Sequence, residues 1–568
     1  MPSRSHLFPV FPALVAVGLL VLAGCAGHSG GRRTAVTSPA VAVAEAGPQD
    51  DYSPAAVKAR TEALARYAAA ILQDLKEEPG LAAEEMTKAA LADLTNEEIV
   101  VEASARLLRL KKTDQAIDLL AKAAARPDAP APIHARLGLA YAMAGKRDLA
   151  IEANRTAIKK DPGNLSGYQY LAQLYLQNNQ ADEGLKVLDE AAKQSKTDAA
   201  YLIDLGETLT MFARAGKMEA AKPRALDAFK RALALKPKNL TLLQRLAEGF
   251  AFLGESEQAA KLYTELVDQM PRAPGMRERL VEILIRGQNR TNAIAQLRSL
   301  TADNPTSPQF NYLLGTLLFE EKQPKEAIEF LNKAIRFNSN FEPAYHDLAA
   351  AQINLKESAA ALETLDKARK RFKENFVTEF YTALAYNRIE DYTNALKFFT
   401  AAEVIARAKE TNRLTPTFLF QLGAAHERTQ KFKEAEVYFR RSLDLMPDFA
   451  EALNYLGYMW ADRGENLSEA RTMIEKAVKL EPENSAFLDS LGWVLHKLGQ
   501  DQEALKYIKQ SIEHNDEPDA TLYEHLGDIY HALRQPDQAR QAFQKAYSIK
   551  PSEQIQRKLN AAAAPAAP

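Results

Sequence analysis

Residues 523–551 read YEHLGDIYHALRQPDQARQAFQKAYSIKP, and this stretch decides the fold. Its two halves predict two helices, the first around Gly527 and the second around Ala539, because small residues let paired helices cross closely. Tyr530 and Phe543 are expected to fill the space between such a pair and its neighbours. Pro551 cannot continue a helix, so the second helix should end before it.

A small residue at the position of Ala539 recurs through most of the chain. The interval between successive occurrences is 34 residues nine times, 35 twice, and 40 and 41 once each. The series is Ala82, Ala116, Ala150, Gly184, Ala225, Ala259, Ala293, Ala327, Ala361, Ala395, Ala435, Ala470, Ala504 and Ala539. A period kept over this length predicts a repeat array rather than several independent globular cores.

The pattern Tyr523-x2-Leu526-Gly527-x2-Tyr530, followed by Ala539-x3-Phe543, resembles the tetratricopeptide repeat (TPR), with tyrosine at the first position where the family usually has tryptophan. The resemblance implies an all-α fold, an α-solenoid (a TPR superhelix) of about 14 helix-turn-helix repeats. Residues 131–553 form the main array, and residues 54–130 form divergent TPR-like helices that keep the small residue but lack the aromatic and proline markers. Residues 208–223 and 405–415 are expected to lengthen a helix or a turn, and residues 554–568 to begin a capping helix and end in a disordered tail.

The N-terminus carries the only cysteine in 568 residues. Residues 13–23 are apolar or glycine, a run that is too short to span a bilayer but suits the apolar part of a signal peptide. Leu22-Ala23-Gly24-Cys25 resembles the bacterial lipobox, in which the cysteine receives lipid. We therefore expect a signal peptide over residues 1–24 and a lipidated Cys25 that starts a flexible linker over residues 25–53, with a reach of about 30 Å. Ala26 in place of aspartate resembles lipoproteins that are sorted to the outer membrane.

The charge balance argues against nucleic acid as a partner. Lysine and arginine number 72 and aspartate and glutamate 74, which gives a formal charge of −2. A chain that binds phosphates needs an excess of cations on one surface. The densest basic run, residues 367–373, is expected to end a helix, where cations interact favourably with the helix dipole.

A set of partner-binding positions follows from helix geometry. In TPR proteins the first helix of each repeat lines the inner surface, and residues three before, one after and four after its small residue share one side. This rule selects aromatic, acidic and hydrogen-bonding residues that suit a protein or peptide partner in the concave groove. The candidates are Phe380, Phe420, Asn454, Tyr458, Asp489, Trp493, His496, Glu524, Asp528 and His531. For each aromatic, packing between repeats is an equal alternative. The same rule places Tyr312 and Thr316 on this face.

Catalytic motifs are lacking. The sequence contains no HExxH, GxSxG or P-loop pattern. His496, Asp528 and His531 are the best candidate constellation, and ordinary solvated histidines are far commoner than metal ligands. We expect no catalytic residues, metal, cofactor or small-molecule substrate.

These features predict a lipid-anchored adaptor or scaffold, not an enzyme, that faces the periplasm from the bacterial outer membrane. The stretch from residue 452 to residue 508 also resembles large TPR outer-membrane lipoproteins, including the scaffold of a periplasmic carboxyl-terminal processing protease. That resemblance implies the protease or its substrates as partner. The alternative is a structural subunit of an envelope machine for outer-membrane protein insertion, pilus assembly or polysaccharide export.

Overall fold

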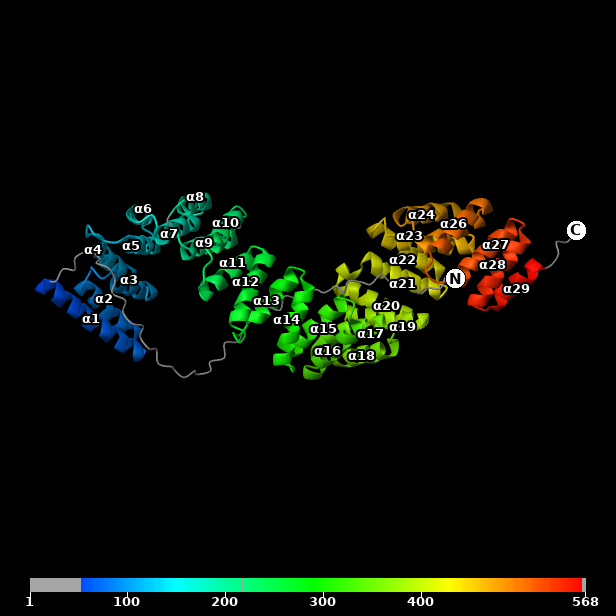
Figure 1. Ribbon diagram of the computed structural model, residues 1–568, viewed down its shortest axis with the longest axis horizontal. Coiled ribbons are helices and arrows are strands. Elements are labelled where there is room, and N and C mark those ends of the chain that lie inside the picture. Colours follow the sequence, from blue (N-terminus) through cyan, green and yellow to red (C-terminus); the bar gives the residue numbers. More distant parts are fainter. Residues whose placement is uncertain (1–52, 196, 216–217, 564–568) are drawn as a thin grey trace. The chain divides into compact units, whose positions relative to one another are not determined.

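The computed structural model describes residues 53–195, 197–215 and 218–563, and the regular elements in these ranges are helices (Figure 1). This confirms the all-α class. The predicted signal peptide, the lipidated Cys25 and the linker up to residue 52 lie outside the described residues, as do residues 564–568.

Helices follow one another in antiparallel pairs, and the pairs match the 34-residue period. The first helices of the pairs are α1 (Pro54–Leu75), α3 (Glu97–Arg109), α5 (Ala131–Met143), α7 (Leu165–Gln177), α9 (Ala199–Ala215), α11 (Leu240–Phe252), α13 (Met276–Arg286), α15 (Pro308–Glu320), α17 (Glu342–Asn354), α19 (Phe376–Arg388), α21 (Pro416–Arg428), α23 (Ala450–Arg463), α25 (Ser485–Lys497) and α27 (Ala520–Ala532). The second helices are α2 (Pro79–Ala92), α4 (Thr113–Ala124), α6 (Arg147–Lys160), α8 (Ala181–Ala192), α10 (Ala221–Ala234), α12 (Ser256–Gln269), α14 (Arg290–Asp303), α16 (Pro324–Phe337), α18 (Ser358–Arg371), α20 (Tyr392–Lys409), α22 (Phe432–Leu445), α24 (Leu467–Leu480), α26 (Asp501–Glu513) and α28 (Pro536–Ile549). A last helix, α29 (Glu553–Ala563), follows the fourteenth pair.

The recurring small residues all lie on the second helices and are buried where the two helices of a pair cross. Ala82, Ala293 and Ala539, for example, are 0% exposed. Every substantial contact between helices in the described residues joins helices no more than two places apart in the chain. The core is therefore built from contacts between helices that are close along the chain, as the repeat period predicts.

Glycines on the first helices make room for a large side chain of the partner helix. A Cβ atom on Gly527 would lie 2.4 Å from Phe543 Cε1, so Phe543 packs within its own pair, and not only between pairs as the sequence suggested. Phe229 on α10 is held between two such glycines. A Cβ on Gly206 of α9 or on Gly249 of α11 would lie 2.5 Å from its ring, which is completely buried.

In the described residues, the turn inside thirteen of the fourteen pairs contains a residue in the left-handed region at nearly the same period, and the turn between α23 and α24 contains a second one, Asn466. Glycine takes this position at Gly145, Gly254, Gly464 and Gly499. Other residues take it at Glu77, Lys111, Asn179, Gln288, Lys322, Lys356, Glu390, Gln430 and Arg534, with φ near +60°. Since residues with a Cβ atom are strained there, these turns are stabilised by the packing of the helices on either side.

The two long repeats contain longer helices. α9 has 17 residues, and α20 has 18 residues and is followed by a short 3₁₀ helix, η1 (Thr411–Arg413). The extra residues of the second insertion thus extend a helix and form a turn.

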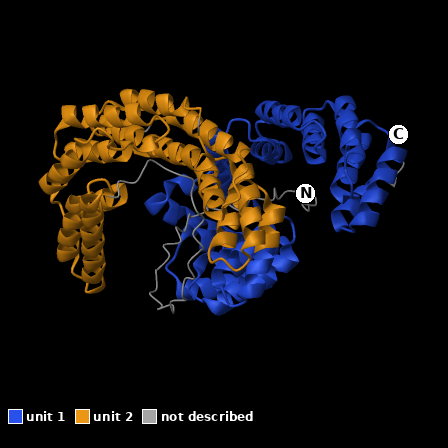
Figure 2. Cartoon of the chain, turned by 60° about the vertical axis from the view of Figure 1, so that its left-hand side comes forward, with its two compact units in different colours: residues 1–22, 297–568 blue, residues 23–296 orange. Residues whose placement is uncertain are grey.

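The chain divides into two compact units, and Figure 2 colours them separately. The first unit along the chain, drawn in orange, comprises residues 23–296, of which the structure describes residues from 53 on; its helix pairs form a curved band in that view. The second contains residues 297–568 and all of the predicted partner-binding positions. None of the helices in the described residues is long and apolar enough to cross a membrane.

Candidate protein-binding site

The ten predicted partner-binding residues lie on α19, α21, α23, α25 and α27, the first helices of five consecutive pairs. Their surroundings differ widely. Some fill the seam between helices, some bond to other parts of the chain, and some lie at the surface.

The two phenylalanines belong mainly to the core. Phe420 is 5% exposed and packs edge-on against Phe449 and Tyr455, with its ring centroid 5.1 Å from that of Tyr455. Phe380 is half-buried and stacks on Phe376 at 5.6 Å. Packing between repeats therefore accounts for the position of Phe420, while Phe380 packs on neighbouring rings and is only half-buried.

Trp493, Asp489 and His525 form a buried cluster between α25 and α27. The His525 ring stacks on Trp493 with centroids 4.0 Å apart, and its Nδ1 donates a hydrogen bond of 2.8 Å to Asp489 Oδ1. Asp489 is 0% exposed and Trp493 8%. The positional rule missed His525, because it lies two residues before Gly527 instead of three. The cluster joins the last two pairs and offers little surface to a partner.

Asn454 is likewise buried on α23, whereas Tyr458, one turn further along that helix, is half-buried. Among the residues predicted to bind a partner, the aromatic side chains that are only half-buried are therefore Tyr458 and Phe380.

His496, Asp528 and His531 do not assemble. His496 Nδ1 lies 2.5 Å from Asp501 Oδ1 at the start of α26, Asp528 bonds to Lys558, and His531 is exposed. Within the described ranges no group of three or more His, Cys, Asp or Glu side chains is placed to hold a metal ion.

The C-terminal helix occupies the acidic end of the predicted surface. Lys558 Nζ of α29 lies 2.7 Å from Glu524 Oε1 and 2.5 Å from Asp528 Oδ2, and Gln554 donates to Glu524 at 2.8 Å. Burial alone would lower the pKa of Lys558, but its bonds to Asp528 and Glu524 raise that pKa above the ordinary value. Both carboxylates thus already have a partner within the chain, and Lys558 balances one of their two negative charges.

A second polar cluster lies on α15 and α17, earlier in the same unit. The Thr316 hydroxyl donates to Asp347 Oδ2 at 2.8 Å, and burial raises the pKa of Asp347. Its neighbour His346 has Nε2 2.9 Å from Thr378 Oγ1 on α19. Burial, followed by the charge of Arg413 from the inserted turn η1, lowers the pKa of His346 to about 4. The sequence rule found Thr316 but not Asp347, which lies one residue off the predicted stripe.

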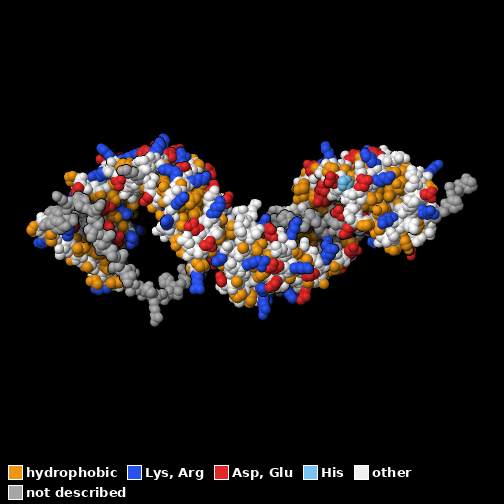
Figure 3. All heavy atoms as spheres, in the orientation of Figure 1, with side chains coloured by type: hydrophobic (Ala, Val, Ile, Leu, Met, Phe, Trp, Pro, Cys, Tyr) orange, Lys and Arg blue, Asp and Glu red, His pale blue; other side chains and the backbone are white. Residues whose placement is uncertain are grey.

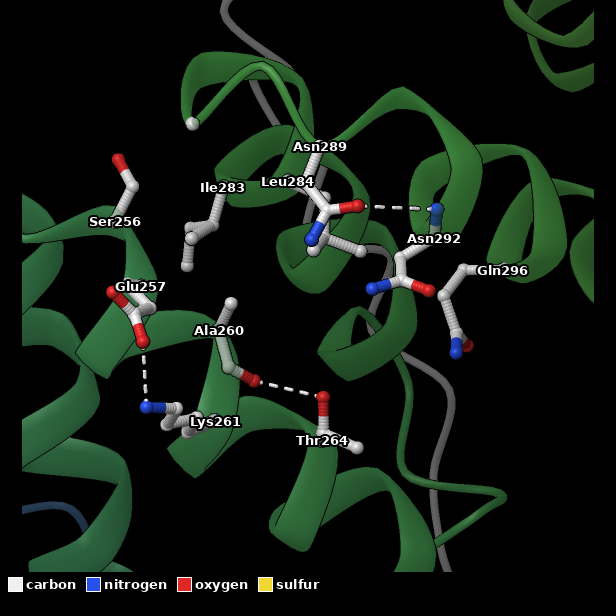
Figure 4. Close-up of a pocket in the computed structure, with 11 residues that line it drawn as sticks. Ser256, Glu257, Ala260, Lys261, Thr264, Ile283, Leu284, Asn289, Asn292 and Gln296 are labelled. Carbon is white, nitrogen blue, oxygen red and sulfur yellow. Dashed lines mark hydrogen bonds and ion pairs between the residues drawn. The ribbon is translucent and has the colours of Figure 1, made fainter.

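A surface pocket of about 700 Å³ lies elsewhere, between α12, α13 and the start of α14 (Figure 4). Its charged residues bond to each other, since Lys261 Nζ lies 2.6 Å from Glu257 Oε1. Asn289 Oδ1 accepts from the backbone of Asn292. These bonds tie its polar groups to the helix surface, so the pocket shows no nucleophile paired with a base.

Models of one repeat family match along most of this array. Family models described as tetratricopeptide repeat match residues 104–164, 141–203, 279–340, 318–385, 416–449 and 463–557. Together these segments include more than half of the chain.

Individual relatives are distant. A TPR repeat-containing protein of Methanocaldococcus jannaschii is 22% identical over 308 residues, which are 54% of this chain and 49% of the relative. The human protein O-mannosyl-transferase TMTC3 is 23% identical over 304 residues, 49% of this chain and 31% of the transferase. The chain therefore spans half or less of the length of these two relatives. In the solved Cut9–Hcn1 hetero-tetramer of APC/C, the matched chain is 13% identical and has a TM-score of 0.39, with 84% of this chain and 98% of that chain covered.

Proposed function

The chain belongs to the tetratricopeptide repeat proteins, and on this basis we propose that it is a lipid-anchored scaffold that binds a protein partner at the bacterial cell envelope. TPR proteins are generally scaffolds without catalytic activity. The lipobox at residues 22–25 supports the anchor, and its resemblance to outer-membrane lipoproteins supports a location facing the periplasm.

The observation that carries the binding proposal is that two of the predicted positions on the first helices of the second unit, Tyr458 and Phe380, are aromatic and only half-buried. The hydrogen bond between Thr316, which is buried, and Asp347 lies on first helices of the same unit. Aromatic rings with one exposed edge give large contact area at low entropic cost, which suits the recognition of a polypeptide. A periplasmic protease or its substrate fits this class of partner.

The partner surface is best placed on α15 to α23. Glu524 and Asp528 bond to Lys558, and Asp489 and Trp493 hold the last two pairs together. We therefore assign contact roles to Tyr458 and Phe380 and supporting roles to Asp489, Trp493 and Asn454.

The test is affinity capture from membranes with the full chain, followed by quantification of the captured proteins. Tyr458→Ala should reduce capture of the main partner by about tenfold or more, the usual effect of truncating an aromatic anchor. Tyr507→Ala is the matched control, because Tyr507 is also half-buried but lies on α26, a second helix. Equal capture by both folded variants would refute this binding surface, and turnover of a peptide by the purified wild-type chain would refute the scaffold role.

A further inference from the structure

The first helix displays a stripe of apolar side chains that nothing in the described residues covers. Its members are Val57, Leu64, Tyr67, Ile71, Leu72 and Leu75 on α1. Leu64 is 61% exposed and Leu75 67%. Hydrophobic side chains are visible over α1 in Figure 3, at the left of the view.

This stripe is separate from the face with which α1 packs on its neighbours. The buried face contains Ala63 and Ala70, which are almost completely buried. At 100° per residue, Leu64 and Ile71 lie roughly 100° around the helix from Ala63 and Ala70. α1 therefore has two apolar faces and uses one of them for the array.

The other end of the array is built differently. α29 buries Ile555 and Ala562 against the last pair, and exposes the polar residues Glu553, Arg557 and Asn560. A polar outer face is what the end of a repeat array needs in water. The apolar stripe of α1 thus indicates that this end contacts something other than water.

Cations flank the stripe on both sides. On a helical projection Lys58 and Lys76 lie along one edge and Arg60 along the other. Glu62 is turned away from the stripe by about 150°. Asp74, near the second edge, bonds to Arg106 of α3 at 2.7 Å. An apolar stripe between cationic edges is complementary to the surface of a bilayer that contains anionic lipids.

We propose that α1 lies in the headgroup region of such a bilayer, with the stripe toward the acyl chains. This proposal rests on the lipid anchor at Cys25 proposed above, since α1 is the first described helix after it and the sequence predicts a linker between them with a reach of about 30 Å. α1 would be a second membrane contact beside the acyl chains, and two contacts hold a protein on a membrane far better than one.

A fluorescence experiment on the full chain tests the proposal. Leu64→Cys and Val404→Cys are each labelled with an environment-sensitive dye, because these side chains are equally exposed, at 61% and 62%. The acylated Cys25 does not react with the dye. Each protein is reconstituted in vesicles of phosphatidylcholine and phosphatidylglycerol, with and without a lipid that carries a quencher in its acyl chain.

The quencher should reduce the emission at residue 64 by about twofold or more and leave residue 404 nearly unchanged. Adding Leu72→Glu and Leu75→Glu should abolish quenching at residue 64 while the chain stays on the vesicles. If the emission of the dye at residue 64 is the same with and without the quencher lipid, the proposal is overturned. So would shielding of residue 64 without vesicles that rises with protein concentration, because a second copy of the chain would then cover the stripe.

Failure of the anchor has a different signature. Dye incorporation into the chain without an introduced cysteine would show that Cys25 is unacylated. Quenching at residue 64 in a Cys25→Ser background would then still report whether α1 contacts the bilayer.

Discussion

The ring of Phe229 gives a sharp test of the packing in the array. Gly206 and Gly249 approach the ring from two different first helices. A clash with a methyl group added on one side therefore cannot be relieved by moving the ring toward the other side. The perturbation is Gly206→Ala, whose new Cβ would lie 2.5 to 2.8 Å from three ring atoms. Ordinary contacts between carbon atoms begin near 3.5 Å.

The expected change in stability on Gly206→Ala is the sum of two opposing effects. Overpacking a well-filled core costs about 1–3 kcal/mol. Alanine in place of glycine inside a helix stabilises the helix by about 0.5–1 kcal/mol. We expect Gly206→Ala to destabilise the first unit by about 1–2 kcal/mol. Gly80→Ala on α2, where no atom lies within 4 Å of the new Cβ, is the control and should be neutral or stabilising.

Hydrogen exchange by mass spectrometry is the appropriate assay, because local stability in a repeat array is not described by one global transition. Exchange should rise in α9, α10 and α11 and stay unchanged beyond residue 300. In a Phe229→Leu background, Gly206→Ala should no longer destabilise, since the ring that it meets is gone. Unchanged exchange in Gly206→Ala with the ring present would refute this account of the packing.

Other positions give further tests. Cys25→Ser should move the protein from the membrane fraction to the wash at high salt, as followed by immunoblotting, because the proposed acylation site is lost. Ala504→Leu should overpack one helix crossing by about 1–3 kcal/mol and raise hydrogen exchange mainly in residues 485–553. Lys356→Gly should raise the local free energy of unfolding of α17 and α18 by up to about 1 kcal/mol, measured by hydrogen exchange, because φ there is +64°. His346 has a folded pKa of about 4, below its unfolded value near 6.5, so its contribution to stability is present above pH 6.5 and is lost as pH falls toward 4. The local stability of wild type relative to His346→Gln, measured by hydrogen exchange, should therefore fall as pH falls through this window. Asp347, whose raised pKa acts in the opposite direction, is common to both proteins.

The repeat period predicted the fold because this fold depends on contacts between helices that are close along the chain. A small residue every 34 positions marks a helix crossing whatever the rest of the sequence does, and even the divergent first two pairs kept it at Ala82 and Ala116.

The candidate site was harder to predict, because its contacts depend on side-chain direction and on partners far along the chain. The stacking of His525 on Trp493 joins residues 32 positions apart, and the Lys558 bonds to Glu524 and Asp528 come from a helix outside the repeat pattern. A rule based on one helix face cannot show whether a side chain on that face is already bonded to, or packed against, another helix of the chain.

The contacts between near neighbours also have a mechanical consequence. Because the substantial contacts between described helices join those one or two places apart, a pulling force within a unit is carried from pair to pair, as by springs coupled in series. Each junction then needs to rotate only slightly for the whole row to lengthen, and the rotations reverse when the force is removed. A protein held at one end and loaded at the other can thus stretch elastically while every helix pair stays folded.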